Sequence, residues 1–218
     1  RINTLIWLAM TTYRSSVAGV ILAAGLSSRY NGNKLLAPLK GKPLIQWVAE
    51  AALASKLDRI VAVFGHEKDQ ARKMVSAILQ DPRFDYIDID DYQSGQSRSV
   101  IAGLMHISRD YAGTMYLMGD QPLIDPAIID EIITTFENSD KGICYPSFNG
   151  KRRNPVIFGE KFYPDILALT GDTGARQIID SNPDSTVSLE YQSEIYFRDV
   201  DREIDLQSLV LDEKNSVK

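Results

Sequence analysis

Cysteine, long apolar runs and clustered basic residues are all scarce in this 218-residue sequence. The single cysteine, Cys144, cannot form an internal disulfide and lies in an apolar run, so we expect a buried thiol and no oxidising compartment. No apolar stretch approaches the roughly 20 residues that span a bilayer. The net charge is −5 and no lysine- or arginine-rich face stands out, so neither a membrane nor nucleic acid is an expected partner.

The first residues differ in character from the rest of the chain. Residues 1–16 contain a short apolar part without a clear small-residue cleavage site after it, so we interpret them as a leader or an upstream translation start. Residues 17–218 show no repeat, low-complexity segment or long linker, which predicts one domain. The expected location is the cytoplasm.

Short apolar runs alternate with helical patterns along residues 17–218. This alternation predicts right-handed βαβ crossovers and an α/β fold, a three-layer αβα sandwich around a mostly parallel, Rossmann-like sheet. Expected strands lie at 17–22, 58–64, 84–89, 114–118, 142–146, 154–158 and 196–201. Expected helices lie at 43–55, 67–79, 97–108 and 172–181.

A glycine- and serine-rich loop follows the first expected strand, where ligands bind in open α/β sheets. Gly25 permits a tight turn, and small side chains before it leave backbone N–H groups open to phosphate. The nucleotide-binding residues expected in this loop are Leu22, Ala23, Ala24 and Gly25. Arg29 and Lys34 supply positive charge for an anion. A plain turn with two solvated cations is the alternative, and GxGxxG and GxxxxGK[ST] are both absent.

Asp120 stands directly after an apolar strand, in Gly119-Asp-Gln-Pro122. A carboxylate at the carboxyl end of a strand is well placed to hold Mg²⁺, which prefers oxygen ligands and keeps substrate phosphates and water. The alternative is that Asp120 caps the helix that starts near Asp125.

The segment from Leu22 to Lys34 resembles the LAAGxSxRxGxxK pattern of nucleotidyltransferases with a glycosyltransferase-A-like fold, known also from nucleotide-diphospho-sugar transferases. Asn31 departs from it by replacing a glycine. The resemblance implies a magnesium-dependent enzyme in which Arg29, Lys34 and Asp120 are catalytic. The late run Asp199-Val-Asp-Arg-Glu-Ile-Asp-Leu206 is similar to that family's DIDTPEDL, which implies that Asp201 joins Asp120 as a metal ligand, although residues 202–204 differ.

Three further segments resemble molybdenum cofactor cytidylyltransferases. Gly95-Gln-Ser-Arg-Ser-Val-Ile-Ala-Gly103 is similar to GxSxSxxxG, which implies that Ser97 and Ser99 approach the nucleotide; helix capping is the alternative. Residues 145–158 resemble YxGxRGNPVLF, with Arg153 in place of a glycine, and residues 169–176 resemble LxGDxGAR. The implied acceptor-binding residues are Arg153, Asn154, Pro155, Gly171, Asp172 and Gly174.

The resemblance therefore implies transfer of CMP from CTP, or of another nucleotide, to the terminal phosphate of a molybdopterin-type acceptor. Mg²⁺ would bind Asp120 and Asp201, and a molybdenum hydroxylase would receive the product. An acceptor phosphate is ionised at neutral pH, so no general base is required. The alternatives are a molybdopterin guanylyltransferase, another small-phosphate nucleotidyltransferase, and a non-catalytic cofactor-binding chaperone for molybdenum hydroxylases.

Overall fold

Apolar runs rich in valine and isoleucine become the inner strands of a mixed sheet in the computed structural model of the chain. The structure describes residues 16–25, 30, 32–65, 68–76, 78, 80–107, 111–172 and 174–216. The strand order across the sheet is β10 (Thr186–Glu190), β7 (Ile143–Phe148), β9 (Val156–Gly159), β6 (Gly113–Met118), β1 (Val17–Ala23), β4 (Arg59–Phe64) and β5 (Phe84–Asp88). The short β8 (Lys151–Arg152) pairs with β7.

The strand directions place several carboxyl ends at one edge of the sheet. β1 runs parallel to β4 and β6, and β4 runs parallel to β5. Their carboxyl ends therefore lie together, with Leu22 of β1 opposite Met118 of β6. The sheet is mixed because β9 runs antiparallel to both β6 and β7, whereas β10 is again parallel to β7.

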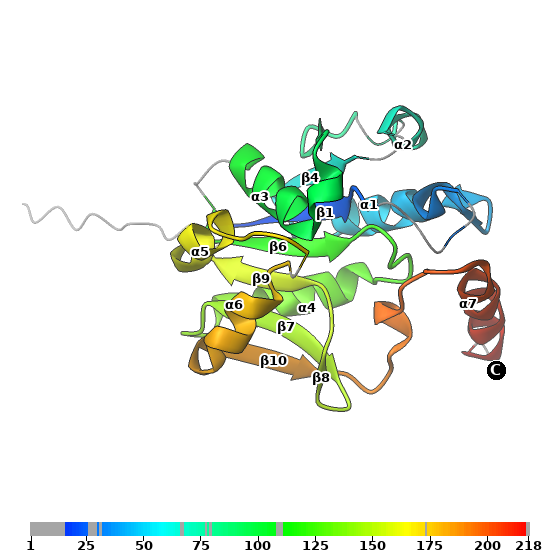
Figure 1. Cartoon of the computed structure of the whole chain (residues 1–218). Coiled ribbons are helices and arrows are strands. Elements are labelled where there is room, and N and C mark those ends of the chain that lie inside the picture. The colour runs from blue at the N-terminus through cyan, green and yellow to red at the C-terminus, as the bar shows by residue number, and fades with distance from the viewer. Residues whose placement is uncertain are drawn as a thin grey trace, which may run out of the picture.

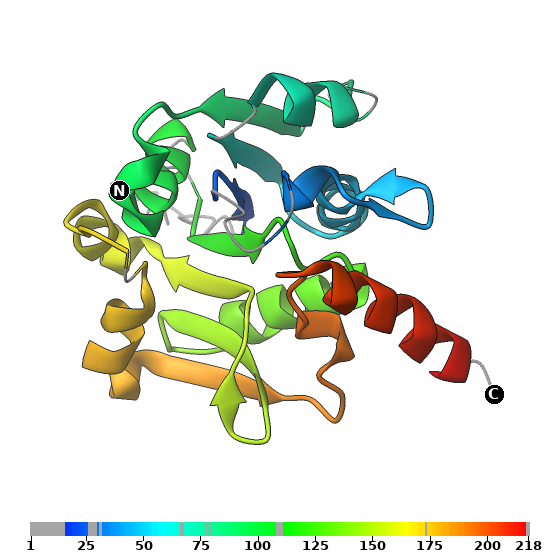
Figure 2. The same ribbon diagram turned by 45° about the vertical axis from the view of Figure 1, so that its right-hand side comes forward.

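Helices cover both faces of the sheet (Figures 1 and 2). One face carries α1 (Leu44–Ala54), α2 (Lys68–Met74) and α4 (Pro126–Glu137), and the other carries α3 (Gln96–His106), α5 (Tyr163–Leu167) and α6 (Arg176–Ser181). Neighbouring residues of β1 serve opposite faces: Ile21 belongs to the core under α1 and α4, and Val20 to the core under α3. The expected three-layer α/β fold is confirmed. Among the described residues, no helix has the length and apolar character needed to cross a bilayer.

A small third core joins the C-terminal segment to the region after the first loop. Val200 and Leu209 pack with Leu39 and Leu44, next to the hairpin of β2 (Pro38–Leu39) and β3 (Lys42–Pro43). Leu209 belongs to α7 (Glu203–Ser216). This packing holds the residues before α7 against the edge where β1 and β6 end.

The prediction of a strand at 196–201 was wrong. The structure has a 3-10 helix at Ile195–Phe197, and residues 198–201 form no strand. The segment instead crosses the end of β6, where the Val200 N–H donates to the backbone oxygen of Asp120 (3.0 Å). The Gln121 side chain donates to the Phe197 backbone oxygen (2.9 Å). Contacts with the 119–121 turn thus replace a strand ladder.

Two helices are shorter than expected, and the short strands β2, β3 and β8 and the longer β10 were not anticipated. The helix expected at 172–181 begins only at Arg176, because the preceding turn has positive φ at Gly171 (+68°) and Gly174 (+56°). The helix expected at 67–79 is described as Lys68–Met74, and His66, Glu67, Ala77 and Leu79 lie outside the described residues. β10 escaped prediction because its residues are only half-buried or exposed, so its sequence carries little apolar signal.

Candidate active site

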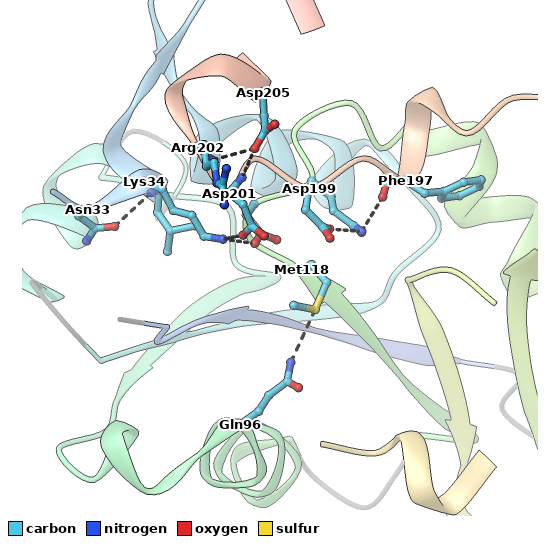
Figure 3. Close-up of polar contacts among 12 residues, drawn as sticks. Asn33, Lys34, Gln96, Met118, Phe197, Asp199, Asp201, Arg202 and Asp205 are labelled. Atoms are coloured by element: carbon cyan, nitrogen blue, oxygen red, sulfur yellow. Dashed lines mark hydrogen bonds and ion pairs between the residues drawn. The ribbon is translucent and has the colours of Figure 1, made fainter. Parts of the chain in front are cut away.

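Lys34 projects from the end of the first loop into a cluster of carboxylates. It begins a 3-10 helix, Lys34–Leu36, whose start is fixed by the buried Asn33 side chain accepting from Leu35 N (3.1 Å). The Lys34 ammonium lies 2.6 Å from Asp120 Oδ2 and 2.8 Å from Asp201 Oδ1. Figure 3 shows Lys34 and Asp201 pointing toward one another, although they are 167 residues apart in the sequence.

Asp120 owes its position to the preceding glycine. Gly119 N donates to Leu22 O (3.0 Å), which extends the β1–β6 pairing by one residue. A Cβ on Gly119 would lie 3.0 Å from the same Leu22 oxygen, so a larger residue would push the two strand ends apart. Asp120 Oδ1 is buried and accepts no hydrogen bond within the described part of the chain. A buried carboxylate oxygen without a donor is costly, and a cation bound there would satisfy it.

The Lys34 cluster is shielded unevenly from water. The side chains of Lys34 and Asp120 are 14% and 13% exposed, whereas that of Asp201 is 42% exposed. Burial alone would lower the pKa of Lys34, but the carboxylates of Asp120 and Asp201 outweigh it and raise that pKa above its usual value. Lys34 therefore stays charged between two carboxylates, where it supplies the positive charge that the site needs.

A third carboxylate, that of Asp199, stands beside this cluster. Gln121 Nε2 donates to Asp199 Oδ1 (2.7 Å) and thereby ties the C-terminal segment to the end of β6. Asp199 borders an open cleft, yet loss of water around its carboxyl, together with the charges of Asp120 and Asp201, raises its pKa to about 6. The site thus holds three carboxyl groups, those of Asp120, Asp199 and Asp201, beside the single ammonium of Lys34.

Two adjoining cavities meet at the carboxylate cluster. The loop cavity, of about 830 Å³, lies between residues 22–25 and residues 92–96. The hairpin cavity, of about 1070 Å³, lies between residues 151–154, the start of α6 and residues 194–199. The residues that line both cavities are Leu22, Gln96, Met118, Asp172 and Asp201. Such a pair of connected cavities can hold two ligands whose ends meet near Asp201.

The structure brings most of the predicted site residues to these cavities. The loop cavity is lined by Leu22, Ala23, Ala24, Gly25, Lys34, Ser99, Asp120, Gly171, Asp172 and Asp201. The hairpin cavity is lined by Arg153, Asn154, Asp172 and Asp201. The wall of neither cavity includes Ser97, Pro155 or Gly174. Ser97 is fully buried, and Pro155 is buried after a cis peptide bond. Arg29 lies outside the described residues.

The turn at residues 171–174 docks on the first turn of α3. Gln96 N donates to Asp172 Oδ1 (3.1 Å), and Ser97 N donates to Gly171 O (3.2 Å). Gly95 has φ of +107°, and a Cβ there would lie 2.5 Å from Gly171 O. Asp172 is therefore the capping partner of α3, and the turn forms a wall shared by both cavities.

Arginine side chains of the β7–β8 hairpin and the residue after it line the hairpin cavity. Arg153 pairs with Glu194, and Arg152 Nη1 lies 3.0 Å from Asp180 Oδ1, so both guanidinium groups are already partly neutralised. Arg176, at the first position of α6, also lines this cavity and forms no ion pair within the described residues. This wall suits an anionic ligand.

Sequence reasoning missed several polar residues that line the cavities, among them Gln96, Gln121, Arg176 and Asp199. Gln121 and Asp199 belong to the Asp-Gln-Pro and Asp-Val-Asp runs, but their mutual contact depends on how the C-terminal segment crosses β6. Gln96 and Arg176 lie within recognised segments, and only the geometry of the turns shows that they face the cavities.

Comparison with known proteins identifies related sequences and folds. Residues 19–187 match the family described as the MobA-like NTP transferase domain. A Thermococcus sibiricus protein named "Probable molybdenum cofactor guanylyltransferase" is 32% identical over 140 residues, 63% of this chain and 65% of that protein. This chain thus spans just under two thirds of that relative's length. The Bacillus subtilis "Purine catabolism protein PucB" is 30% identical over 167 residues, 75% of this chain and 80% of that protein.

The fold also matches solved structures. The Rv0371c protein of Mycobacterium tuberculosis H37Rv superposes with a TM-score of 0.78 at 22% identity, covering 90% of this chain and 97% of that one. A second structure of that protein, solved in complex with manganese, gives a TM-score of 0.73 at 20% identity, covering 90% of this chain and 98% of that one. At these identities the likeness concerns the fold alone.

Proposed function

This chain belongs to the family of MobA-like NTP transferase domains, and we propose that it transfers CMP from CTP to the terminal phosphate of a molybdopterin-type cofactor. The observation that carries the proposal is the Lys34–Asp120–Asp201 cluster at the junction of two cavities. In this proposal the loop cavity receives the nucleotide and the hairpin cavity receives the phosphorylated acceptor. A molybdenum hydroxylase then takes up the product.

The choice of CTP rests on sequence segments that resemble cytidylyltransferases. Molybdopterin guanylyltransferases more often have Leu-Ala-Gly-Gly and Asp-Met-Pro where this chain has Ala24 and Gln121. The Arg153-Asn-Pro-Val156 and Gly171-Asp-Thr-Gly-Ala-Arg176 segments support a molybdopterin acceptor over a sugar phosphate. Arg153 and Arg176 border the hairpin cavity, where an anionic acceptor would gain from their charge.

GTP is the second candidate nucleotide. The Thermococcus sibiricus relative, named "Probable molybdenum cofactor guanylyltransferase", is 32% identical to this chain over 140 residues. A non-catalytic chaperone that only binds the cofactor is the alternative from another functional class. The Lys34–Asp120–Asp201 cluster argues against a chaperone. A protein that only binds the cofactor does not need a lysine shared between two carboxylates, or the buried Asp120 Oδ1 that accepts no hydrogen bond within the described residues.

The residues present fit a divalent metal ion. Asp120 Oδ1 is buried and has no donor within the described residues, and burial together with the charges of Asp120 and Asp201 raises the pKa of the neighbouring Asp199. Asp120 and Asp201 would hold Mg²⁺, and phosphate oxygens and water would complete its coordination, as Mg²⁺ commonly requires. Consistent with that arrangement, no group of three His, Cys, Asp or Glu side chains forms a ready metal cage among the described residues. Bound Mg²⁺ would supply charge neutralisation for the reacting phosphates.

In the proposed reaction, a phosphate oxygen of the acceptor forms a bond to the α-phosphorus of CTP. The bond from that phosphorus to the bridging oxygen breaks, and pyrophosphate leaves with the electron pair. The acceptor phosphate is already ionised, so no side chain has to remove a proton. The chain's own residues bind and align two polyanions against their mutual repulsion: Lys34 attracts the triphosphate, and Arg153 and Arg176 attract the acceptor.

A nucleotide panel tests the proposal. Purified protein with Mg²⁺ and molybdenum cofactor is incubated with CTP, GTP, ATP or UTP, and pyrophosphate release is measured. We expect CTP to give the fastest release. Equal or faster release with GTP would refute the cytidylyl assignment in favour of the guanylyl one. No release with any nucleotide, in a protein that still binds the cofactor, would favour the chaperone.

A further inference from the structure

Gln96 occupies the boundary between the two cavities. Of the five residues that line both cavities, Leu22 and Met118 are apolar, and Asp172 and Asp201 are carboxylates already engaged by Gln96 N and by Lys34. Gln96 is the member of this set that brings a neutral side-chain N–H donor to the junction. Anything that passes from one cavity to the other lies beside this amide.

The side-chain donor of Gln96 has a poor acceptor within the protein. Its Nε2 atom lies 3.9 Å from the Met118 sulfur, and within the described residues that is its one hydrogen-bond partner. A thioether sulfur is a weak acceptor, so this contact gives little of the free energy that an amide gains from an oxygen. Figure 3 shows Gln96 extending from α3 toward Met118 and the end of β6. The amide is therefore available to a ligand oxygen.

The first turn of α3 holds Gln96 in place. Its backbone N–H donates to Asp172 Oδ1 (3.1 Å), and the next N–H donates to Gly171 O (3.2 Å). The side-chain oxygen packs so closely on the 171–174 turn that a Cβ on Gly174 would lie 2.6 Å from it. The backbone contacts fix the start of the Gln96 side chain, and its amide nitrogen faces the Met118 sulfur at the junction. A donor fixed in advance costs no reorganisation when charge develops near it.

We propose that Gln96 is a catalytic residue whose Nε2–H donates a hydrogen bond to a non-bridging oxygen of the phosphoryl group in transfer. This proposal rests on the proposed function, in which that phosphoryl group passes from the loop cavity to the hairpin cavity. The amide gives and takes no proton. Because it is neutral, it binds a phosphoryl oxygen without pairing permanently with the neighbouring carboxylates of Asp172 and Asp201, as an arginine would.

Three glutamines provide a matched test. Gln93 lines the loop cavity alone, Gln177 lines the hairpin cavity alone, and Gln96 lines both. Each is replaced by leucine, and Gln96 is also replaced by glutamate, which keeps its shape but loses the donor. The measurements are kcat and both KM values for pyrophosphate release, the Kd of the nucleotide without acceptor, and the melting temperature of each variant.

We expect Gln96→Leu and Gln96→Glu to lower kcat by about a hundredfold to a thousandfold, the range reached on losing one transition-state donor. The nucleotide Kd of Gln96→Leu should stay within about threefold of wild type, because the donor acts on the transferring group. Gln93→Leu and Gln177→Leu each remove a wall contact of one cavity, so we expect them to raise the KM of one substrate without the loss of kcat expected for Gln96. The melting temperatures identify any variant that does not fold. If one of Gln96→Leu and Gln96→Glu fails to fold, the kcat of the other still tests the role of Gln96.

An active wild type whose Gln96→Leu and Gln96→Glu variants retain kcat overturns the role of Gln96 and leaves the proposed function intact. A Gln96→Leu variant that changes only KM also overturns the catalytic role, because Gln96 would then contribute to substrate binding alone. A wild type that releases no pyrophosphate with any nucleotide overturns the proposed function, and the role of Gln96 with it.

Discussion

The Lys34 ammonium lies 2.6 Å from Asp120 Oδ2, although the two residues come from different loops far apart in the chain. The same ammonium reaches Asp201, so one cation is shared by the two carboxylates proposed to hold the metal. A bound divalent ion and Lys34 would compete for the same two carboxylates. Lys34 would have to turn toward the triphosphate when the metal binds, which links metal loading to nucleotide binding.

This competition gives the first prediction, for Lys34→Met. Removal of the competing cation should strengthen Mn²⁺ binding in the absence of nucleotide by about tenfold, or roughly 1.4 kcal/mol, while pyrophosphate release falls steeply. Mn²⁺ binding can be followed by electron paramagnetic resonance or calorimetry. Lys42→Met is the control, because Lys42 pairs with Glu50 and lines neither cavity. Unchanged or weaker Mn²⁺ binding in Lys34→Met would contradict the competition.

The second prediction separates chemistry from stability with two aspartates. Asp120→Asn keeps the shape of the side chain but removes its charge, so we expect at least about a hundredfold loss of activity with little change in melting temperature. Asp125→Ala removes the N-cap of α4, where Asp125 accepts from Ala127 N (2.8 Å), and should cost about 1 kcal/mol of stability while activity persists. An active Asp120→Asn variant would argue against the metal role of Asp120.

Asp199 gives a prediction about pH. Its pKa is raised to about 6 in the folded protein, so between the unfolded value near 3.9 and about 6 the folded state binds more protons than the unfolded state. Its contribution to stability therefore falls as pH rises through that window. Asp199→Asn removes this cost and keeps an oxygen for Gln121, so it should be more stable than wild type at pH 7.5, by about 1 kcal/mol after allowance for solvent screening in the cleft.

The gain of Asp199→Asn over wild type should shrink toward zero at pH 4, where both side chains are uncharged. Denaturant unfolding at the two pH values, in metal-free buffer with a chelator, measures both differences. A gain that is equal at both pH values would show that the effect is not the charge of Asp199.

The contact of Gly95 with Gly171 gives a fourth prediction. Gly95→Ala places a Cβ 2.5 Å from Gly171 O at a φ of +107°, so we expect a loss of about 2–3 kcal/mol in stability and weaker binding of both substrates. Gly41→Ala is the control: its φ is +82° but the space around it is open, so only backbone strain of about 1 kcal/mol remains. Equal melting temperatures for the two variants would exclude a tight contact between the two turns.

The sequence was sufficient to predict the central strands and the loop after β1, because apolar β-branched runs and small residues reflect local rules. It did not predict the path of residues 195–201, because two contacts with the 119–121 turn, absent from any local pattern, replace the expected strand there. Lys34 and Asp120 were predicted as site residues from the loop after β1 and the end of β6, and their contact follows from the parallel order of these two strands. Gln96 escaped notice because its side chain is an ordinary polar group until the 171–174 turn fixes it.

The docking of α7 has a consequence for the order in which the protein matures during synthesis. Lys34 and Asp120 are made first, and strands β1 and β6 can bring them together before the later residues are translated. Asp201 can reach Lys34 only after residues 200–209 have been made and Val200 and Leu209 pack beside Leu39. The carboxylate pair is thus completed last, so a nascent chain would not present both carboxylates to a metal ion before the rest of the fold is in place.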